Sequence, residues 1–276
     1  MTDLRLGDVY PHPFDTGGAS FAEVLRRAAP EAAPDWLAGR PMPHELASRV
    51  VEGTTVLALV HKDGVVIAGD RRATAGNIIS KSDMRKIFPA DTYSAVGISG
   101  AAGPAMELAR VFATELEHYE KVEGETLSLE GKSNKLAGMV RGNLGMAMQG
   151  IVVVPLFAGV DPRTGQSGIF EYDPIGGRYA ARRHAAAGSG SLIARQTLKH
   201  ASDPGQDADR AALVAITALF DAAEQDSATG GPDLMRELYP IVAVIDPDGY
   251  RELEEADIRG HIDQIIEVRT QARTEA

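Results

Sequence analysis

The sequence of 276 residues contains no cysteine, which excludes disulfide bridges, a thiol nucleophile and a thiolate metal site. It also has no apolar run near the ~18–20 residues that a membrane-spanning helix needs. The first residues lack the basic start and apolar stretch of an export signal, so we expect a cytoplasmic location. The 28 Lys and Arg and 39 Asp and Glu give a formal net charge of −11. This charge argues against a nucleic-acid partner, and nothing in the sequence calls for a metal or a cofactor.

Residues 1–53 differ in composition from the rest of the chain. They hold six of the fifteen prolines, no lysine and the only tryptophan, Trp36. Ser20 followed by Glu23 predicts one short helix over residues 20–27, and prolines then interrupt regular structure. On composition alone, this segment fits a flexible arm and a removable propeptide equally well.

From Thr54 onward, strand and helix patterns alternate. Strands are predicted at residues 56–60, 65–70, 78–79, 87–88, 93–98, 151–154, 168–172, 178–181 and 239–245. Helices are predicted from residue 104 and at 133–149, 191–200 and 207–224, followed by a docking helix near the C-terminus. Tight turns such as Asp63-Gly64 make the sheets mainly antiparallel. The order predicts an α+β domain in which two sheets lie between helical layers.

Three of these helices carry specific expectations. The helix that opens near Pro104 should have an apolar face of Leu108, Val111, Phe112 and Leu116, and the docking helix one of Ile258, Ile262 and Ile265. The helix over 133–149 should bury Leu136, Val140, Leu144 and Met148. It also contains glycines at 138, 142 and 145, each costing roughly 1 kcal/mol relative to alanine. We therefore expect another element to pack closely against it.

The step Gly53-Thr54-Thr55 marks the boundary between the two parts of the chain. Cleavage before Thr54 would expose a threonine with its own nucleophile, the hydroxyl, and its own base, the free α-amine, whose ordinary pKa is ~7.7–8.0. Most such triplets are ordinary strand entries, so the step alone is a weak signal.

Other residues could support such chemistry. Asp70 ends the second strand of the hairpin that starts at Thr54, and Lys86 lies about one strand pair further on. A Lys–Asp pair beneath the nucleophile would lower the cost of deprotonating it, whereas an incidental surface ion pair is the commoner arrangement. The glycine-rich segments 97–103 and 188–191 precede helices, and fit both anion-binding loops and ordinary tight turns.

Five sequence blocks occur in order between residue 54 and about residue 250. They are Thr54-Thr55-Val56 through Gly69-Asp70-Arg71-Arg72-Ala73-Thr74, Lys86-Ile87, Gly97-Ile98-Ser99-Gly100, Gly188-Ser189-Gly190-Ser191 and Asp226-Ser227-Ala228-Thr229-Gly230-Gly231. Together they resemble the β subunits of bacterial (actinobacterial) proteasome core particles. The resemblance implies an N-terminal-nucleophile hydrolase, with a four-layer αββα sandwich over residues 54–276 and a propeptide, residues 1–53, that is removed on maturation.

The resemblance also implies roles for single residues. Thr54 would be the nucleophile of a threonine endopeptidase and, through its amine, the base, with Asp70 and Lys86 as the supporting charge pair. The Gly100 N–H would stabilise the oxyanion. A hydrogen-bonding network around the amine would involve Ser189, Asp226 and Thr229. Thr229 stands where the family often has serine, so the hydroxyl is kept.

For the substrate, the resemblance implies that Thr74, Gly100 and Ala102 bind the peptide backbone as an added strand. The pocket beside the scissile bond would be walled by Ala73, Met84 and Ile98. Because all three are apolar, we expect cleavage after hydrophobic residues. Plain core packing explains Met84 and Ile98 equally well.

Gly53 and the compositional break beside it suggest how the chain matures, and the resemblance suggests how it assembles. The Thr54 hydroxyl would cut the Gly53–Thr54 bond autocatalytically, since Gly53 has no Cβ to hinder the approach. The family implies seven-membered β rings stacked between rings of α subunits (α7β7β7α7). Unfolded polypeptides would be degraded in the enclosed chamber, with an ATPase or other regulator acting through the α rings.

Two other interpretations stay open. A non-catalytic scaffold subunit is disfavoured because Thr54, Asp70 and Lys86 occur together. An amidase acting on a small molecule is disfavoured, less strongly, by the Thr74 segment and the apolar pocket.

Overall fold

The structure is a computed structural model that describes residues 53–274. These residues form two five-stranded sheets in which all neighbouring strands are antiparallel. In spatial order, the first sheet contains β10 (His184–Gly188), β1 (Thr55–His61), β2 (Gly64–Gly69), β11 (Ile241–Asp246) and β12 (Gly249–Glu252). The second contains β5 (Ile87–Asp91), β6 (Ser94–Gly97), β7 (Leu156–Val160), β8 (Ser167–Tyr172) and β9 (Arg178–Ala181). A separate hairpin joins β3 (Ala73–Ala75) to β4 (Ile78–Lys81).

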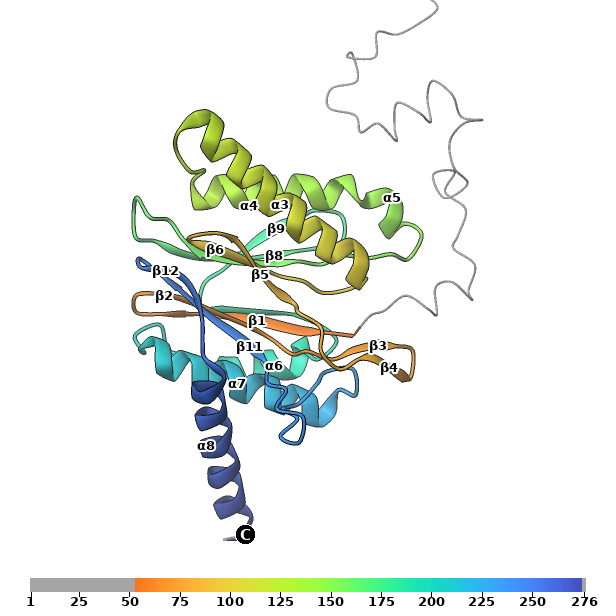
Figure 1. Cartoon of the computed structure of the whole chain (residues 1–276), viewed down its shortest axis with the longest axis vertical. Helices are drawn as coiled ribbons and strands as arrows, with labels where there is room; N and C mark the ends of the chain where they lie inside the picture. The colour runs from red at the N-terminus through yellow and green to blue at the C-terminus, as the bar shows by residue number, and fades with distance from the viewer. Residues whose placement is uncertain (1–52, 275–276) are drawn as a thin grey trace, which may run out of the picture.

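Helices cover the outer face of each sheet (Figure 1). Over the second sheet lie α3 (Ala102–Glu123) and α4 (Leu129–Gly142), followed by the short α5 (Leu144–Ala147). Over the first sheet lie α6 (Ser191–Ala201) and α7 (Ala208–Gln225), and α8 (Glu255–Thr274) packs on α7 before it extends away from the body. The four-layer αββα sandwich is therefore confirmed.

The side-chain alternation of β1 explains how these layers stack. Val56 and Ala58 point into the core between the two sheets, whereas Leu57 and Leu59 point into the core beneath α6 and α7. All four are fully buried. Because both faces of the strand are covered, it reads in the sequence as a continuous apolar run rather than an alternating one.

Several strands differ from the sequence-based expectation. Residues 78–79 belong to β4, which pairs in the separate hairpin with β3, a strand that was not predicted. The strand predicted at 151–154 is wrong, because only Val153 forms a bridge there and β7 starts at Leu156. Both β10 and β12 escaped prediction, since their sequences HAAAG and GYRE are poor in β-branched residues. The turn of the first hairpin is Lys62-Asp63, and Gly64 already belongs to β2.

The helix predicted at 133–149 is instead two helices. α4 begins at Leu129 after Ser128, whose hydroxyl caps it, and ends at Gly142. Leu144 and Met148, expected in the core, are 41% and 79% exposed. A Cβ at glycine 142 or 145 would meet nothing within 4 Å, and one at 138 only a distal arginine nitrogen. The close-packing element expected there is thus absent from residues 53–274.

The two remaining helix faces are largely as predicted. Ile258, Ile262 and Ile265 of α8 are all buried, which confirms the docking face. In α3 the buried face includes Leu108, Phe112 and Leu116, but Val111 is exposed.

The helix predicted at residues 20–27 lies outside the described residues. Between residues 53 and 274, no helix has the length and apolar character needed to cross a membrane.

Candidate active site

The β1–β2 hairpin brings Asp70 back beside the start of β1, next to Thr54. The Asp70 N–H donates to the Thr55 carbonyl at 3.1 Å, and the Asp70 carboxylate is fully buried. Four donors saturate its two oxygens. Oδ1 accepts from the Thr55 N–H (2.8 Å) and Lys86 Nζ (2.6 Å), and Oδ2 from the backbone N–H groups of Arg72 (2.9 Å) and Gly230 (2.8 Å). The carboxylate is therefore held in one position.

Lys86 precedes β5 and is as completely buried as Asp70. Its Nζ donates to Asp70, to the Gly53 carbonyl at 3.2 Å and to the Arg72 carbonyl. Three acceptors match the three N–H bonds of an ammonium group. Burial lowers the pKa of Lys86 below its ordinary value, although the Asp70 carboxylate opposes that shift. A cation thus lies against the carbonyl of the Gly53–Thr54 peptide bond.

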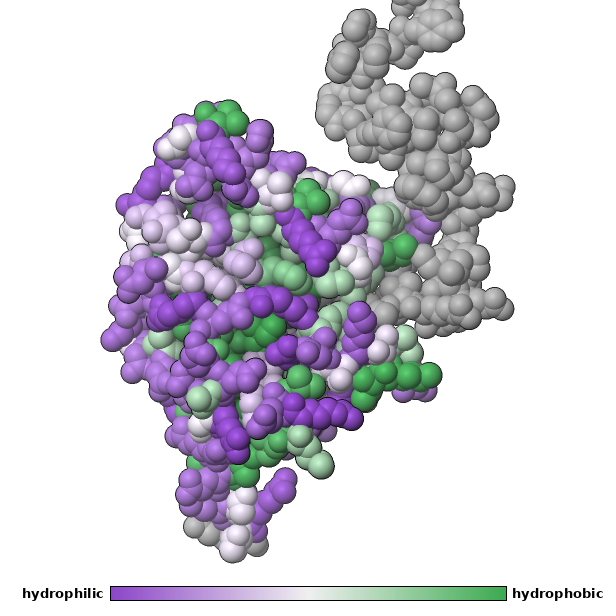
Figure 2. Space-filling model, in the orientation of Figure 1, coloured by the Kyte–Doolittle hydropathy of each residue, from purple (hydrophilic) through white to green (hydrophobic). Residues whose placement is uncertain are grey.

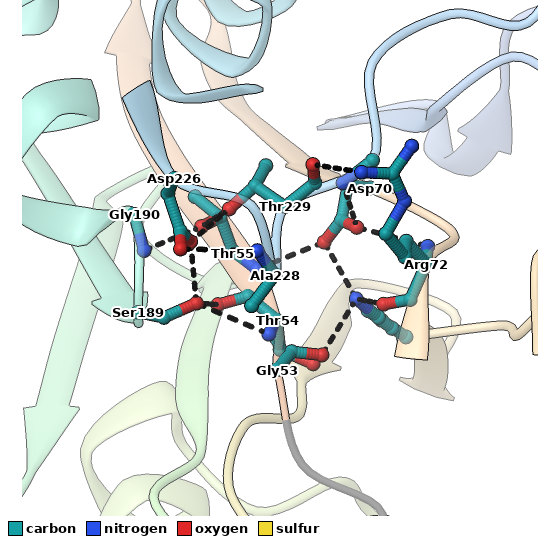
Figure 3. Close-up of polar contacts among 12 residues, drawn as sticks. Gly53, Thr54, Thr55, Asp70, Arg72, Ser189, Gly190, Asp226, Ala228 and Thr229 are labelled. Carbon is teal, nitrogen blue, oxygen red and sulfur yellow. Dashed lines mark hydrogen bonds and ion pairs between the residues drawn. The ribbon is translucent and has the colours of Figure 1, made fainter. Parts of the chain in front are cut away.

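A second polar cluster lies on the other side of Thr54 (Figure 3). Ser189, between β10 and α6, donates its N–H to the Thr54 carbonyl at 2.8 Å. Its Oγ lies 3.5 Å from the Thr54 nitrogen and 2.6 Å from Asp226 Oδ2. The Thr229 hydroxyl donates to the same carboxylate oxygen at 2.6 Å. Burial raises the pKa of Asp226, but the hydrogen bonds from Ser189 and Thr229 outweigh it, so that the pKa is lowered overall.

The backbone at Gly53 requires glycine. Its φ of +96° is a conformation that residues with a side chain rarely adopt, and a Cβ there would lie 2.3 Å from the Thr74 hydroxyl oxygen. The chain is continuous through this point, so the Thr54 nitrogen is an amide nitrogen. The structure therefore contains the bond whose cleavage the sequence predicts.

Gly100 shares a cavity of about 390 Å³ with Gly53, Thr54 and Ser189. Its φ is +88°, and a Cβ would lie 2.1 Å from the Val152 carbonyl oxygen. The hydrogen bonds that flank it run from Ala101 to Val152 and from Val154 to Ser99, so the ladder leaves the Gly100 N–H unused. Gly100 thus borders the same cavity as Thr54. The same cavity is also lined by Glu171, Tyr172 and Arg195, which the sequence did not single out.

The residues expected around the substrate occupy three places. Ala73, Met84 and Ala102 are buried in one small apolar cluster. Ile98 is 1% exposed and belongs to the core beneath α3 and α4. Thr74 is half-buried beside Gly53. None of the five residues borders the cavity just described. Their role in substrate binding stays a prediction.

Sequence reasoning missed two residues that take part in both clusters. The Thr55 hydroxyl lies 2.7 Å from the Thr229 hydroxyl and accepts the Gly190 N–H at 3.0 Å. The Arg72 guanidinium donates to the carbonyls of Ser227 and Thr229. The alternation of β1 was the available signal for Thr55, because it turns this side chain away from that of Thr54.

This arrangement suits acyl transfer by a hydroxyl group. It combines a buried cation, an unused backbone donor and a hydroxyl–carboxylate network around one threonine. No group of three His, Cys, Asp or Glu side chains in the described part of the chain could hold a metal ion.

Comparison with known proteins gives the family. The model of the family described as "Proteasome subunit" matches residues 50–234. The chain belongs to the proteasome subunit family. It is 50% identical to "Proteasome subunit beta" of Stackebrandtia nassauensis over 254 residues, 90% of each chain. It is likewise 50% identical to the Acidimicrobium ferrooxidans protein over 255 residues (91% and 92% of the chains) and 48% identical to that of a Parafrankia species over 267 residues (97% and 95%).

Within the family the chain is a β subunit. It is a threonine endopeptidase of the proteasome core particle, in which it assembles with α subunits. The resemblance found in the sequence is thereby confirmed. The buried pair of Asp70 and Lys86 should contribute to the stability of the fold, and the free energy of unfolding of a variant measures that contribution.

Asp70→Asn leaves the Lys86 ammonium buried without its carboxylate, and should lower the free energy of unfolding by about 3–5 kcal/mol. The control Glu117→Gln breaks an exposed pair with Lys121, whose side chains are 64% and 71% exposed, and should cost less than about 1 kcal/mol. Denaturant unfolding of the unassembled subunit measures both values. Small, equal losses would contradict a tightly coupled buried pair.

Proposed function

We propose that Thr54 is the nucleophile of this endopeptidase and becomes active when the Gly53–Thr54 bond is cut, which releases residues 1–53 as a propeptide. The observation that supports this most strongly is the position of Thr54 between two polar clusters. Lys86 and Asp70 lie on one side, and Ser189 and Asp226 lie on the other.

Maturation starts with attack of the Thr54 hydroxyl on the Gly53 carbonyl carbon. The Lys86 ammonium, 3.2 Å from the carbonyl oxygen, stabilises the negative charge that develops there. The C–N bond then breaks, the Thr54 nitrogen takes up a proton, and residues 1–53 remain attached through an ester. Hydrolysis of the ester frees the propeptide. Since no free amine exists before this step, a water molecule accepts the hydroxyl proton.

In the mature enzyme the free Thr54 amine is the base. It takes the proton of the Thr54 hydroxyl, the oxygen attacks the substrate carbonyl, and the amine returns the proton to the leaving nitrogen. The Gly100 N–H stabilises the oxyanion, and the network of Ser189, Asp226 and Thr229 holds the amine. Water then hydrolyses the acyl-enzyme ester and regenerates Thr54.

Substrate recognition relies mainly on the peptide backbone. An extended chain adds as a strand to Thr74, Gly100 and Ala102, which gives affinity with little dependence on side chains. The apolar cluster that contains Ala73 and Met84, together with Ile98, favours a hydrophobic residue before the scissile bond.

Assembly into seven-membered β rings between α rings completes the proposal. Exposed apolar side chains support such contacts: Ile78 and Ile79 of the β3–β4 hairpin are 72% and 53% exposed, and a hydrophobic patch lies at that hairpin (Figure 2). A second group, Leu144 and Met148, lies at the two ends of α5. Enclosed active sites let a peptidase of low specificity act on unfolded polypeptides in the cytoplasm, which a regulator delivers through the α rings.

Replacement of Thr54 tests both the cleavage before Thr54 and the hydrolysis of peptide substrates. In core particles co-expressed with the α subunit, Thr54→Ala should keep the full-length mass and Trp36 fluorescence and lose peptidase activity. The wild-type chain should lose 53 residues and all of its tryptophan, because the only tryptophan lies in the segment released. A Thr54→Ala particle that cleaves peptides at the wild-type rate would contradict the threonine mechanism and leave the scaffold interpretation in its place.

Fluorogenic peptides test the pocket. Peptides with Leu or Tyr before the cut should be hydrolysed faster than those with Arg or Glu, because the predicted pocket walls are apolar. The ratio of kcat/KM values is the measurement, and we expect at least about tenfold. Faster cleavage after Arg or Glu would exclude Ala73, Met84 and Ile98 as the pocket walls.

A further inference from the structure

Thr55, the residue after the proposed nucleophile, connects the two clusters that surround it (Figure 3). Its backbone N–H donates to Asp70 Oδ1 at 2.8 Å, on the side of Lys86. Its hydroxyl lies 2.7 Å from the Thr229 hydroxyl, on the side of Asp226. The side chain is fully buried. One residue therefore contacts both the charge pair and the network around the Thr54 nitrogen.

The direction of these hydrogen bonds follows from the donors available. The lowered pKa of Asp226 keeps its carboxylate an acceptor, so Thr229 uses its single O–H proton to donate to it. The Thr229 oxygen can then only accept, and Thr55 must be its donor. The Thr55 oxygen in turn accepts the Gly190 N–H at 3.0 Å. The chain of bonds runs in one direction, from Gly190 through Thr55 and Thr229 to Asp226.

The space around this series of hydrogen bonds is just large enough for the two hydroxyls of Thr55 and Thr229. A Cβ at Gly190 would lie 2.5 Å from the Thr55 hydroxyl oxygen and 2.7 Å from that of Thr229. The backbone of Gly190 has φ −84°, which any residue can adopt, so glycine is required here by its neighbours rather than by the backbone. The two hydroxyls are the nearest of these, and the Ala222 Cβ at 3.0 Å is the next. Gly190 also follows Ser189 directly, so the Thr55 hydroxyl fixes the loop that carries Ser189.

We propose that the Thr55 hydroxyl is a positioning group for catalysis, which holds Ser189 and Asp226 in place around the Thr54 amine. The inference rests on the proposed role of that amine as base. The Thr55 hydroxyl bonds to Gly190 and Thr229 rather than to Thr54. It acts by tying the Ser189 loop to Asp226 through Gly190 and Thr229, so that the hydroxyl of Ser189 stays within reach of the nitrogen of Thr54.

A valine at this position separates positioning from packing. Valine has the shape of threonine but no hydroxyl, so Thr55→Val keeps the strand and its packing and leaves the Gly190 N–H and the Thr229 oxygen without a buried partner. Serine keeps the hydroxyl and removes a methyl group. A purely structural role would make valine the milder change, whereas a positioning role makes serine the milder one.

The experiment uses core particles co-expressed with the α subunit and a hydrophobic fluorogenic peptide. Rates are expressed per processed chain, counted by mass spectrometry. Thr55→Val should lower kcat roughly 10- to 100-fold with KM within about threefold of wild type, and Thr55→Ser should stay within about threefold in both. Where Thr55→Val slows the release of residues 1–53, the processing rate should show the same ranking. As a matched control, Thr217→Val removes a half-buried hydroxyl from α7 and should change neither value.

Gly190→Ala places a methyl group against the same two hydroxyls and should displace them. It should therefore reproduce the loss in kcat, and it provides the test if Thr55→Val fails to assemble. Wild-type kcat in Thr55→Val, wild-type kcat in Gly190→Ala, or a loss in Thr55→Ser as large as in Thr55→Val would each overturn the inference. These results are distinct from failure of the proposed function, which an active Thr54→Ala particle would reveal.

Discussion

The ion pair between Lys86 and Asp70 is the interaction on which the rest of the site depends. Removing two charged groups from water costs several kcal/mol for each, and their mutual attraction offsets this only when the remaining bonds of both are satisfied. Here the bonds are satisfied by backbone groups of Thr55, Arg72, Gly230 and Gly53. Those groups come from the start of β1, the segment after β2 and the loop before β11. The hydrogen bonds that the buried ion pair needs therefore hold segments that are distant in the sequence together around Thr54.

The same constraint links maturation to catalysis. In the uncut chain, the Lys86 ammonium lies against the Gly53 carbonyl, and Gly53 itself has a positive φ. After cleavage, the proposed mechanism uses the same cation beside a free amine, with Ser189 and Asp226 already in place on the other side. On the proposed mechanism, the uncut chain would already carry the site in nearly complete form and would lack only the free amine of Thr54.

Sequence patterns predicted the layers and most strands, because β1, β2 and β11 are apolar on both faces and α7 is apolar along most of its length. They failed where the signal is not local. Leu144 and Met148 follow a helical period but are exposed, since α4 ends at Gly142. Thr54, Asp70 and Lys86 could be named from the motif, and the structure brings them together. Thr55 was missed because the alternation of β1 indicates only that its side chain points away from that of Thr54. Its partners Gly190 and Thr229 lie more than a hundred positions away, and no spacing rule predicts a bond across that separation.

The most direct test of the central claim uses a peptide epoxyketone, whose adjacent electrophilic carbons can capture a hydroxyl and a neighbouring amine in one ring. Digestion of treated core particles followed by mass spectrometry locates the adduct. The account predicts a ring adduct on the peptide that begins with Thr54, and none in Thr54→Ala particles. Loss of activity with the adduct on any other residue would contradict it.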